Sequence, residues 1–545
     1  MTHRGRWLWL GLIVLGTADP VSAQSAPPVR RLPGPVRAAA NAITRDQLAR
    51  DLAILAQDAW NGRASLSPGL DSAASFIIQR LTRAGLKPLG DSGTFRQYYS
   101  VREGETDRAG HYLEFGNTRY RGADLLVLGY GGAWTAEGPV VYVGHGHRYP
   151  KGGIDPYAGV NVRGRIVLAH SAVPLPGFGW EFPPDVQPSM LAALEQGAAG
   201  VIYLPSAPLL ARWNQMAQNP ARFRELDPPV PSAYAFRRQQ SVAVRAELAD
   251  SLLAGTGHTA ATLMARAERE DYPASFELPA GRTVTIQVPA GAERTHRGYN
   301  VVALLEGSDP VLRNEYVTVA AHLDGAVGRA PAGSDTVWNA ADDNASGSAA
   351  ILRIAEELAR APRPRRSIVF IWDSGEEVGL WGTRSFVGRP VLPLDRIITH
   401  FNVDMIGATR APGMPDSAEA EVMGPNEVMM IGPRVLSTGL DSLLEQTNRE
   451  YLNMRLNREH DRADSEFFYP RTDAGPFLER GIPIVEFFTG IHRRYHLPSD
   501  EAQYLDPVKM EAVARTVLAG LWMVADLPER PRLDKGIPAS VPRHR

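Results

Sequence analysis

The 545-residue sequence has no cysteine, so disulfide bonds and a lipid anchor on an N-terminal cysteine are both excluded. Lysine is almost as scarce, with four residues in the whole chain. The formal net charge is only −2, which gives no reason to expect a nucleic acid or an anionic membrane as a partner. After residue 23 no apolar run is long enough to cross a bilayer, so no membrane span is predicted. Stability must therefore come from the core and from any bound metal.

The first 23 residues have the pattern of a secretory signal peptide. Arg4 and Arg6 precede an apolar run of about ten residues, and the small residues of "VSA" end at Ala23. We therefore expect residues 1–23 to be removed and the protein to be exported, to the periplasm or the medium. Residues 24–37 are rich in Pro, Arg and Ala and are predicted to be a disordered lead-in.

The chain is too long for a single small core. Between residues 121 and 289 its pattern of apolar residues and glycines changes. Short β-branched runs bounded by glycine, such as "GPVVYVGHG", "GRIVLAH" and "AAGVIYLP", predict a small β-rich unit there. His145 and His147 lie two residues apart in it and could hold a metal. Because no carboxylate is close in sequence, we favour a structural role for both.

From residue 290 to 527 the sequence alternates strand and helix patterns, which is typical of α/β proteins. We predict a mixed, mostly parallel sheet flanked by helices, formed by residues 38–120 and 290–527 around the inserted unit at 121–289. The stretch "AASFIIQRLTRAG" predicts an amphipathic helix that ends at Gly85. Residues 528–545 form a proline-rich tail.

Chemistry-bearing side chains follow several predicted strands of this sheet. In open α/β sheets ligands bind beyond the carboxyl ends of the strands, so these side chains should meet at one edge. They are His322 and Asp324 after "YVTVAA", Glu376 and Glu377 after "SIVFIWDSG", Asp404 in "HFNVDMIG", His496 after "PIVEFF", and Asp343 in the loop "NAADDNASGSAA".

Four of these carboxylates, Asp343, Glu376, Glu377 and Asp404, would repel one another without cations. Each pair near 4 Å costs roughly 4 kcal/mol at a protein-like dielectric. Two divalent ions would remove the repulsion, and a mixture of imidazole and carboxylate ligands suits zinc better than magnesium or calcium. The sequence therefore predicts two zinc ions.

The region from about residue 300 to 500 resembles the exported di-zinc metallopeptidases related to bacterial leucine aminopeptidase and glutamate carboxypeptidase II. The motifs that carry the resemblance are "AAHLDG", "NAADDNASGSAA", "DSGEEVGLWGTRSF", "FNVDMIG" and "FFTGIHRRYHLPSD". The unit at 121–289, with "YAGVNVRGRIVLAH" and "ALEQGAAGVIYLP", resembles the protease-associated domain found inserted in exported peptidases.

The resemblance assigns a role to each of these residues. His322 and Asp404 would bind one zinc ion, Glu377 and His496 the other, and Asp343 would bridge both. A hydroxide bridging the metals would attack a peptide substrate, with Glu376 as general base. Asp324 would orient the imidazole of His322, and Tyr495 would stabilise the tetrahedral intermediate. A cis peptide bond between Asp343 and Asn344 is also implied.

Two positions depart from the family pattern: Gly325 stands where relatives have His or Ser, and Ala474 where many have His. The leading hypothesis is an exported zinc aminopeptidase. The alternatives are a carboxypeptidase or dipeptidase of the same fold, a glutaminyl cyclase with one zinc ion, and a noncatalytic receptor-like relative. All six metal-site and base residues are present, which disfavours the last two.

Overall fold

The computed structural model describes residues 31–107, 109–128, 133–179, 186–219, 222–228, 240–279, 282–326, 328, 335–411 and 421–542. The predicted signal peptide, residues 1–23, lies outside the described residues. Residues 32–545 form one unit, which contains every element discussed below. None of the described helices is long and apolar enough to cross a membrane.

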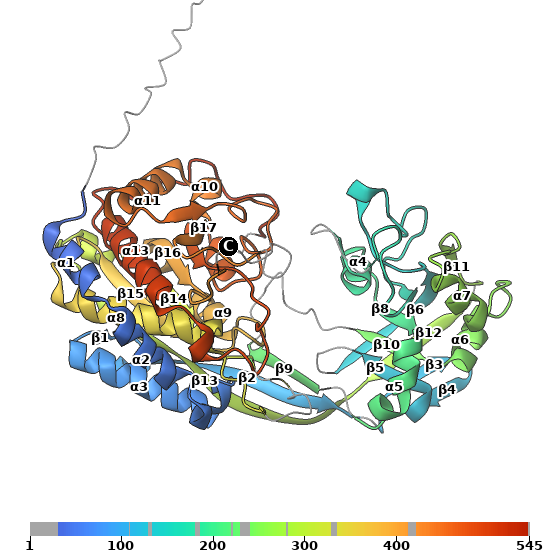
Figure 1. Cartoon of the computed structure of the whole chain (residues 1–545). Helices are drawn as coiled ribbons and strands as arrows, with labels where there is room; N and C mark the ends of the chain where they lie inside the picture. Colours follow the sequence, from blue (N-terminus) through green and yellow to red (C-terminus); the bar gives the residue numbers. More distant parts are fainter. Residues whose placement is uncertain are drawn as a thin grey trace, which may run out of the picture. The chain divides into compact units, whose positions relative to one another are not determined.

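A ten-stranded mixed sheet forms the first part of this unit (Figure 1). Its four central strands, β15, β14, β16 and β19, run parallel to one another, while β13, β2 and β9 extend it as antiparallel neighbours. The order is β18 (Arg455–Asn457), β17 (Glu427–Ile431), β19 (Ile484–Phe488), β16 (Ile397–Val403), β14 (Tyr316–His322), β15 (Ser367–Asp373), β13 (Ala290–Leu305), β2 (Arg96–Thr106) and β9 (Arg222–Asp227), with β1 (Lys87–Pro88) also paired to β13.

The central strands are buried along almost their whole length because helices cover both faces of the sheet. Alternate residues serve opposite faces: Phe370 and Trp372 join the core of one face, and Val369 and Ile371 that of the other. One face is covered by α1 (Gly34–Ala42), α2 (Arg45–Leu55), α3 (Pro68–Ala84), α8 (Gly347–Arg360), α11 (Thr438–Tyr451) and α13 (Pro507–Ala525); the other by α9 (Trp381–Gly388), α10 (Pro433–Leu436) and α12 (Ala474–Glu479).

The first helices follow local signals in the sequence. Helix α2 begins with a capping box in which Thr44 and Gln47 each accept a hydrogen bond from the other's backbone N–H. Helix α3 ends at Gly85, whose φ of 77° provides the predicted C-terminal cap. Helix α1 corrects the predicted lead-in at 24–37, because it begins at Gly34 and buries Val36 and Ala40 against the core.

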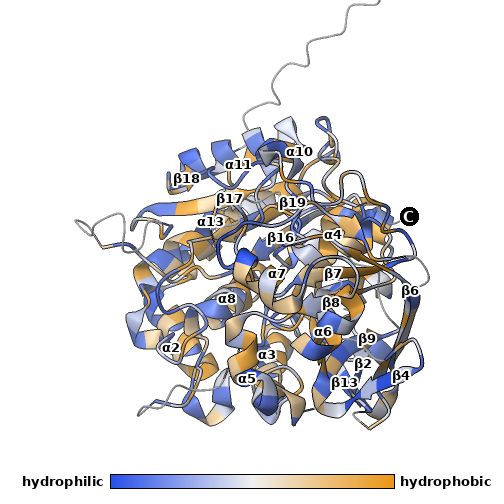
Figure 2. Cartoon of the chain, turned by 90° about the vertical axis from the view of Figure 1, so that its right-hand side faces the viewer, coloured by the Kyte–Doolittle hydropathy of each residue, from blue (hydrophilic) through white to orange (hydrophobic). Residues whose placement is uncertain are grey.

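A second, nine-stranded sheet forms the inserted unit. Its strands β6, β7, β8 and β10 are parallel, and apolar side chains cover both of its faces. In Figure 2 strand β7 is apolar and strand β4 hydrophilic, in keeping with their burial. The order is β4 (Thr118–Arg121), β3 (Tyr112–Phe115), β12 (Thr283–Val288), β6 (Trp134–Tyr142), β7 (Ile166–His170), β8 (Gly200–Leu204), β10 (Ser241–Val244) and β5 (Leu125–Leu128), with β11 (Phe276–Glu277) paired to β6.

Four helices accompany this second sheet, α4 (Ser189–Glu195), α5 (Ala207–Ala217), α6 (Ala246–Leu253) and α7 (Ala260–Ala267). The β-rich inserted unit and the mixed sheet with its helices confirm the predicted fold class. Strands β3 and β4 join the second sheet although they precede residue 121, and β9, from within 121–289, pairs with β2 of the first sheet.

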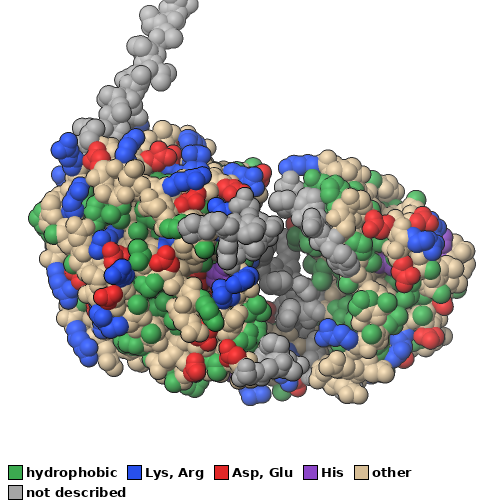
Figure 3. All heavy atoms as spheres, in the orientation of Figure 1, with side chains coloured by type: hydrophobic (Ala, Val, Ile, Leu, Met, Phe, Trp, Pro, Cys, Tyr) green, Lys and Arg blue, Asp and Glu red, His purple; other side chains and the backbone are tan. Residues whose placement is uncertain are grey.

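The described part of the proline-rich tail packs on the first sheet's unit. Val541 is buried, and Arg530 donates a hydrogen bond to Glu315 at 2.9 Å. Figure 3 shows Lys and Arg side chains interspersed with Asp and Glu over the face in view. This face therefore carries no strong field of one sign, as the small net charge leads us to expect.

Candidate metal centre

The predicted ligands meet at the carboxyl edge of the first sheet. His322 is the last residue of β14, and Asp404 directly follows β16. Glu377 lies in the loop after β15, and His496 in the loop after β19. Asp343 comes from the turn that leads into α8. Neighbouring parallel strands end side by side, so the topology brings these distant residues together.

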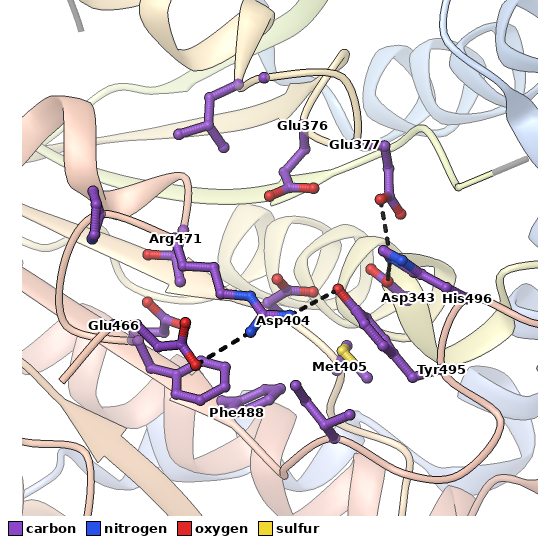
Figure 4. A pocket seen from close by; sticks show the side chains of 17 residues that line it. Asp343, Glu376, Glu377, Asp404, Met405, Glu466, Arg471, Phe488, Tyr495 and His496 are labelled. Atoms are coloured by element: carbon purple, nitrogen blue, oxygen red, sulfur yellow. Dashed lines mark hydrogen bonds and ion pairs between the residues drawn. The ribbon is translucent and has the colours of Figure 1, made fainter. Parts of the chain in front are cut away.

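Asp343 contacts both histidines and divides the group into two halves. Figure 4 shows it beside His496 and Glu377. Its Oδ1 lies 3.1 Å from Nε2 of His322, and its Oδ2 lies 3.0 Å from Nε2 of His496. Nε2 of His322 is also 3.4 Å from Oδ1 of Asp404, and Nε2 of His496 is 3.0 Å from Oε2 of Glu377. Each half offers one imidazole nitrogen and two carboxylate oxygens within 4.8 Å of one another. This is the geometry of two adjacent cation sites that share one carboxylate.

The inward atoms of these side chains fit a metal rather than a hydrogen-bond network. Nε2 of His322 and of His496, Oδ1 of Asp404 and Oε1 of Glu377 are buried and make no hydrogen bond to any described residue. Buried polar atoms are nearly always satisfied, so four unsatisfied atoms around one point indicate a missing ligand. Imidazole and carboxylate donors in two sets of three suit zinc.

Comparison with known proteins agrees with this geometry. Residues 300–521 match the model of "Peptidase family M28". This region is similar to peptidase family M28. The match begins at residue 300 and so leaves out the inserted unit, which comes earlier in the chain.

Two curated relatives each match less than half of the chain. It is 29% identical over 235 residues to "Leupeptin-inactivating enzyme 1" from Streptomyces exfoliatus, covering 41% of this chain and 44% of that protein. It is 31% identical over 194 residues to "Aminopeptidase" from Pseudomonas aeruginosa, covering 35% of this chain and 31% of that protein. The matches thus span less than half of either relative.

A solved structure, "Aminopeptidase from Aneurinibacillus sp. strain AM-1", resembles almost the whole chain. The TM-score is 0.50 at 18% identity, over 94% of this chain and 100% of that one. At this identity the likeness concerns the fold alone.

The electrostatics of the site reflect the burial of several acids together. Burial raises the pKa of Glu376 well above its usual range, and the neighbouring Glu377 and Asp404 raise it further. Burial, with Asp343, raises the pKa of Glu377 to about 7. Burial alone would also raise the pKa of Asp343, but the neighbouring imidazoles of His322 and His496 lower it.

His322 is oriented by the backbone of Asp324 rather than by its carboxylate. Nδ1 of the imidazole lies 3.0 Å from the Asp324 carbonyl oxygen and 3.9 Å from the nearer carboxylate oxygen. A carbonyl can only accept, so Nδ1 carries the hydrogen and Nε2 presents its lone pair inward. The Asp324 carboxylate instead accepts from the Ser65 hydroxyl at 2.6 Å and from the Glu376 backbone N–H at 3.3 Å. Asp324 thus connects the His322 strand to the loop of Glu376.

Sequence reasoning missed the residues that hold the Asp343 loop. The Asp500 carboxylate accepts hydrogen bonds from the backbone N–H groups of Asp342 and Asp343 at 3.0 and 3.2 Å. The Asp342 carboxylate accepts from the backbone N–H of Gly407 at 2.7 Å. Asp500 ends the motif "HLPSD", which was the available signal. The peptide bond between Asp343 and Asn344 is cis, as predicted.

Arg63 is the second support that sequence reasoning missed. It is fully buried and donates to the carbonyl oxygens of Leu323, Leu55, Asn339 and Ala340 at 2.7–2.9 Å. It therefore links the segment before α3 to the backbone beside His322 and ahead of Asp343. No local sequence signal marks it, because its partners are up to 277 residues away.

A pocket of about 450 Å³ opens from the metal-facing side chains. Tyr495 lines it, with its ring stacked on His496 at 3.7 Å and its hydroxyl accepting from Arg471 at 3.3 Å. In Figure 4 the Tyr495 hydroxyl points toward Arg471. Both groups lie across the pocket from Glu376 and Glu377. Tyr495 is thus placed where it could contact a substrate.

Packing accounts for the departure from the family pattern at Gly325. A Cβ on Gly325 would lie 2.4 Å from the Cβ of Ala340 and 2.7 Å from the Gly62 carbonyl oxygen. A His or Ser at this position would therefore clash. Ala474 is fully buried at the start of α12, in the core below the pocket.

The two histidines of the inserted unit have structural partners. Nε2 of His147 lies 3.0 Å from the Val173 carbonyl oxygen, and its Nδ1 accepts from the Ser189 backbone N–H at 3.2 Å. Nδ1 of His145 accepts from the His147 backbone N–H. These hydrogen bonds agree with the structural role favoured for both residues.

Proposed function

We propose that the chain is a zinc-dependent aminopeptidase that hydrolyses the amino-terminal peptide bond of its substrates. The observation that carries this proposal is the position of Asp343, whose two oxygens each face a different histidine. His322, Asp343 and Asp404 would hold one zinc ion, and Asp343, Glu377 and His496 the other. When bound, zinc supplies Lewis-acid polarisation of a carbonyl and lowers the pKa of water to about 7.

Glu376 is the residue we assign as general base. It lines the pocket beside Glu377, and its carboxylate lies within 4.8 Å of ligand atoms of His322 and Glu377. Its backbone N–H donates a hydrogen bond to the Asp324 carboxylate, which links the Glu376 loop to the end of β14. A carboxylate with a raised pKa can take a proton from water and later give it to the leaving amine. Glu377 would thus bind a metal ion, and its neighbour Glu376 would accept the proton of the water.

The charge of the pocket favours the amino end of a peptide. Two zinc ions would carry one positive charge more than the carboxylates of Asp343, Glu377 and Asp404 can balance, and a bound hydroxide would neutralise it. The other acids of the lining are Glu376, Glu466 and Glu486, against the cation Arg471. An ammonium group beside these acids would favour their charged forms, whereas a carboxylate would not. A carboxypeptidase needs the opposite preference at this position. The name "Aminopeptidase" of the Pseudomonas relative agrees with this direction.

Metal removal and one substitution test the proposal. Chelation should abolish hydrolysis of amino-terminal reporter substrates, and zinc should restore it. Glu376→Gln should keep two zinc ions but lose roughly 100- to 10,000-fold in kcat, because a general base is removed. Glu427→Gln is the matched control: Glu427 is a buried glutamate of the same sheet, outside the pocket lining. Full activity of the Glu376 variant, or cleavage of amino-blocked substrates alone, would contradict the proposal.

We also propose that residues 1–23 direct export and are removed, so that the mature protein begins near Gln24. The basic and apolar pattern of this segment supports the proposal. Amino-terminal sequencing of protein from the periplasm and from the medium would test it. An intact Met1 terminus on the active protein would contradict it.

A further inference from the structure

The pocket continues past the metal-facing residues into a chamber with apolar walls. Phe467, Phe488 and Ile491 contribute ring and aliphatic surface. The charged groups of this part are Glu466, Arg471 and Glu486. A substrate side chain next to the reacting bond would enter this chamber, so its lining decides which side chain is accepted.

Glu486 is an unusual member of the lining because it lies within a buried strand. It occupies the middle of β19, between β16 and β17, where it pairs with Asn402 and Ile431. Successive side chains of a strand point to opposite faces. Glu486 therefore points to the same face as Phe488, and Phe487 points into the core on the opposite face. Glu486 is 1% exposed, and its Oε2 makes no hydrogen bond to any described residue. Burial raises the pKa of Glu486 well above its usual range, and a cation beside it would favour the charged form. The buried oxygen without a hydrogen bond points to a ligand that supplies this partner.

The other two charged groups of the chamber compensate each other. Arg471 and Glu466 form an ion pair at 3.4 Å, and Glu466 is 56% exposed at the pocket's outer side. The Arg471 guanidinium also donates to the Tyr495 hydroxyl and lies 5.2 Å from the centre of the Phe467 ring. With this pair neutral, Glu486 is the acid of the chamber that is left to bind a substrate group.

We propose that Glu486 makes the pocket selective for substrates whose amino-terminal residue carries a long cationic side chain, lysine or arginine. The aliphatic stem packs against the stacked rings of Phe467 and Phe488, and the ammonium or guanidinium group donates to the Glu486 carboxylate. This inference rests on the proposed aminopeptidase function and names its substrate class. A glutamyl side chain would place a second acid beside Glu486, and a leucyl side chain would leave its Oε2 without a hydrogen bond.

Kinetics with four reporter substrates test the inference on the zinc-loaded, full-length protein. We expect kcat/KM for lysyl and arginyl 4-nitroanilides to exceed that for the leucyl compound by roughly 10-fold or more, and glutamyl to be poorest. Glu486→Gln and Glu486→Met should each lower the lysyl-to-leucyl ratio by roughly 10- to 100-fold, because a charge-assisted hydrogen bond is lost. The matched control Glu427→Gln should leave this ratio unchanged. An unaltered ratio in both Glu486 variants would overturn the inference.

Binding of the free amino acids gives a readout independent of turnover. By calorimetric titration, L-lysine should bind the holoprotein more tightly than L-leucine or L-glutamate, and Glu486→Gln should remove this preference. If the protein cleaves the leucyl reporter but neither cleaves lysyl nor binds lysine preferentially, the inference fails and the proposed function stands. If no reporter is cleaved but lysine binds through Glu486, the cation pocket stands and the proposed function fails. Preference for glutamate would instead assign recognition to Arg471 and refute the role of Glu486.

Discussion

Arg63 gives the sharpest test of how this fold supports its metal centre. The residue has no exposed surface, and its guanidinium donates four hydrogen bonds to backbone carbonyls. Burial lowers its pKa to about 10, so it stays charged at neutral pH. Arg63→Met keeps most of the aliphatic stem and removes all four donors. The variant therefore isolates the hydrogen bonds from the packing.

The expected loss follows from the acceptors left behind. One buried polar group without a partner costs about 1–3 kcal/mol, and breaking a buried charged network costs about 3–5 kcal/mol. Four carbonyls at the lower limit give about 4 kcal/mol for the fall in the free energy of unfolding. This is a large share of the roughly 5–15 kcal/mol that stabilises a typical domain. Zinc affinity should also fall by roughly 10- to 100-fold, because Leu323 and Ala340 adjoin the ligand segments.

Urea unfolding of the metal-free protein and zinc titration of the folded protein measure the two effects separately. The control is Arg360→Met on α8, where the arginine is 66% exposed and pairs only with Glu357 in the described contacts. It should change the free energy of unfolding by less than about 0.5 kcal/mol. The reasoning is wrong if Arg63→Met costs less than about 1 kcal/mol, or if it weakens the fold and leaves zinc affinity unchanged.

Three further predictions concern the site and the inserted unit. Asp343→Asn should reduce zinc stoichiometry in calorimetry from two to at most one, since an amide has a single ligand oxygen; retention of two ions would argue against bridging. Gly325→Ala should cost about 1–3 kcal/mol in urea unfolding, because the added Cβ would meet that of Ala340, whereas Gly439→Ala, with open space around it, should cost nothing. Burial lowers the pKa of His170 from 6.5 to about 4, so the folded protein binds fewer protons than the unfolded chain between these values. Stability should therefore fall as the pH drops from 6.5 to 4, and less steeply in His170→Gln; equal slopes would refute this.

Much of the metal centre could be predicted because parallel sheets impose a simple geometry. The strands ending at His322, Asp373 and Val403 could be recognised as continuous apolar runs, and strand ends in such a sheet share an edge. Asp343 could be placed with them because the small residues after it begin the helix packed below. The sheet geometry therefore brought the ligand set together before any coordinates were known.

The supports of the site could not be predicted in the same way. Arg63 donates to the backbone of segments far away in the chain, so no pattern of side-chain types marks it. Asp500 accepts from the backbone N–H groups of Asp342 and Asp343, and only its place in the motif "HLPSD" marks it. Strand β9 pairs with β2 of the first sheet, a long-range pairing with no local signal. Glu486 stands in the apolar strand sequence "PIVEFF", and only its burial beside the pocket sets it apart.

Protein groups other than the metal ligands support the Asp343 loop. Ala340 and His496 have positive φ values of 49° and 54°, a conformation that costs a non-glycine residue roughly 1–2 kcal/mol. Arg63 binds the Ala340 carbonyl, and Asp500 binds the N–H groups that follow it, so hydrogen bonds from protein groups offset this cost. These contacts are made by protein groups other than the metal ligands, so they contribute to the conformation of the loop in addition to any bound metal.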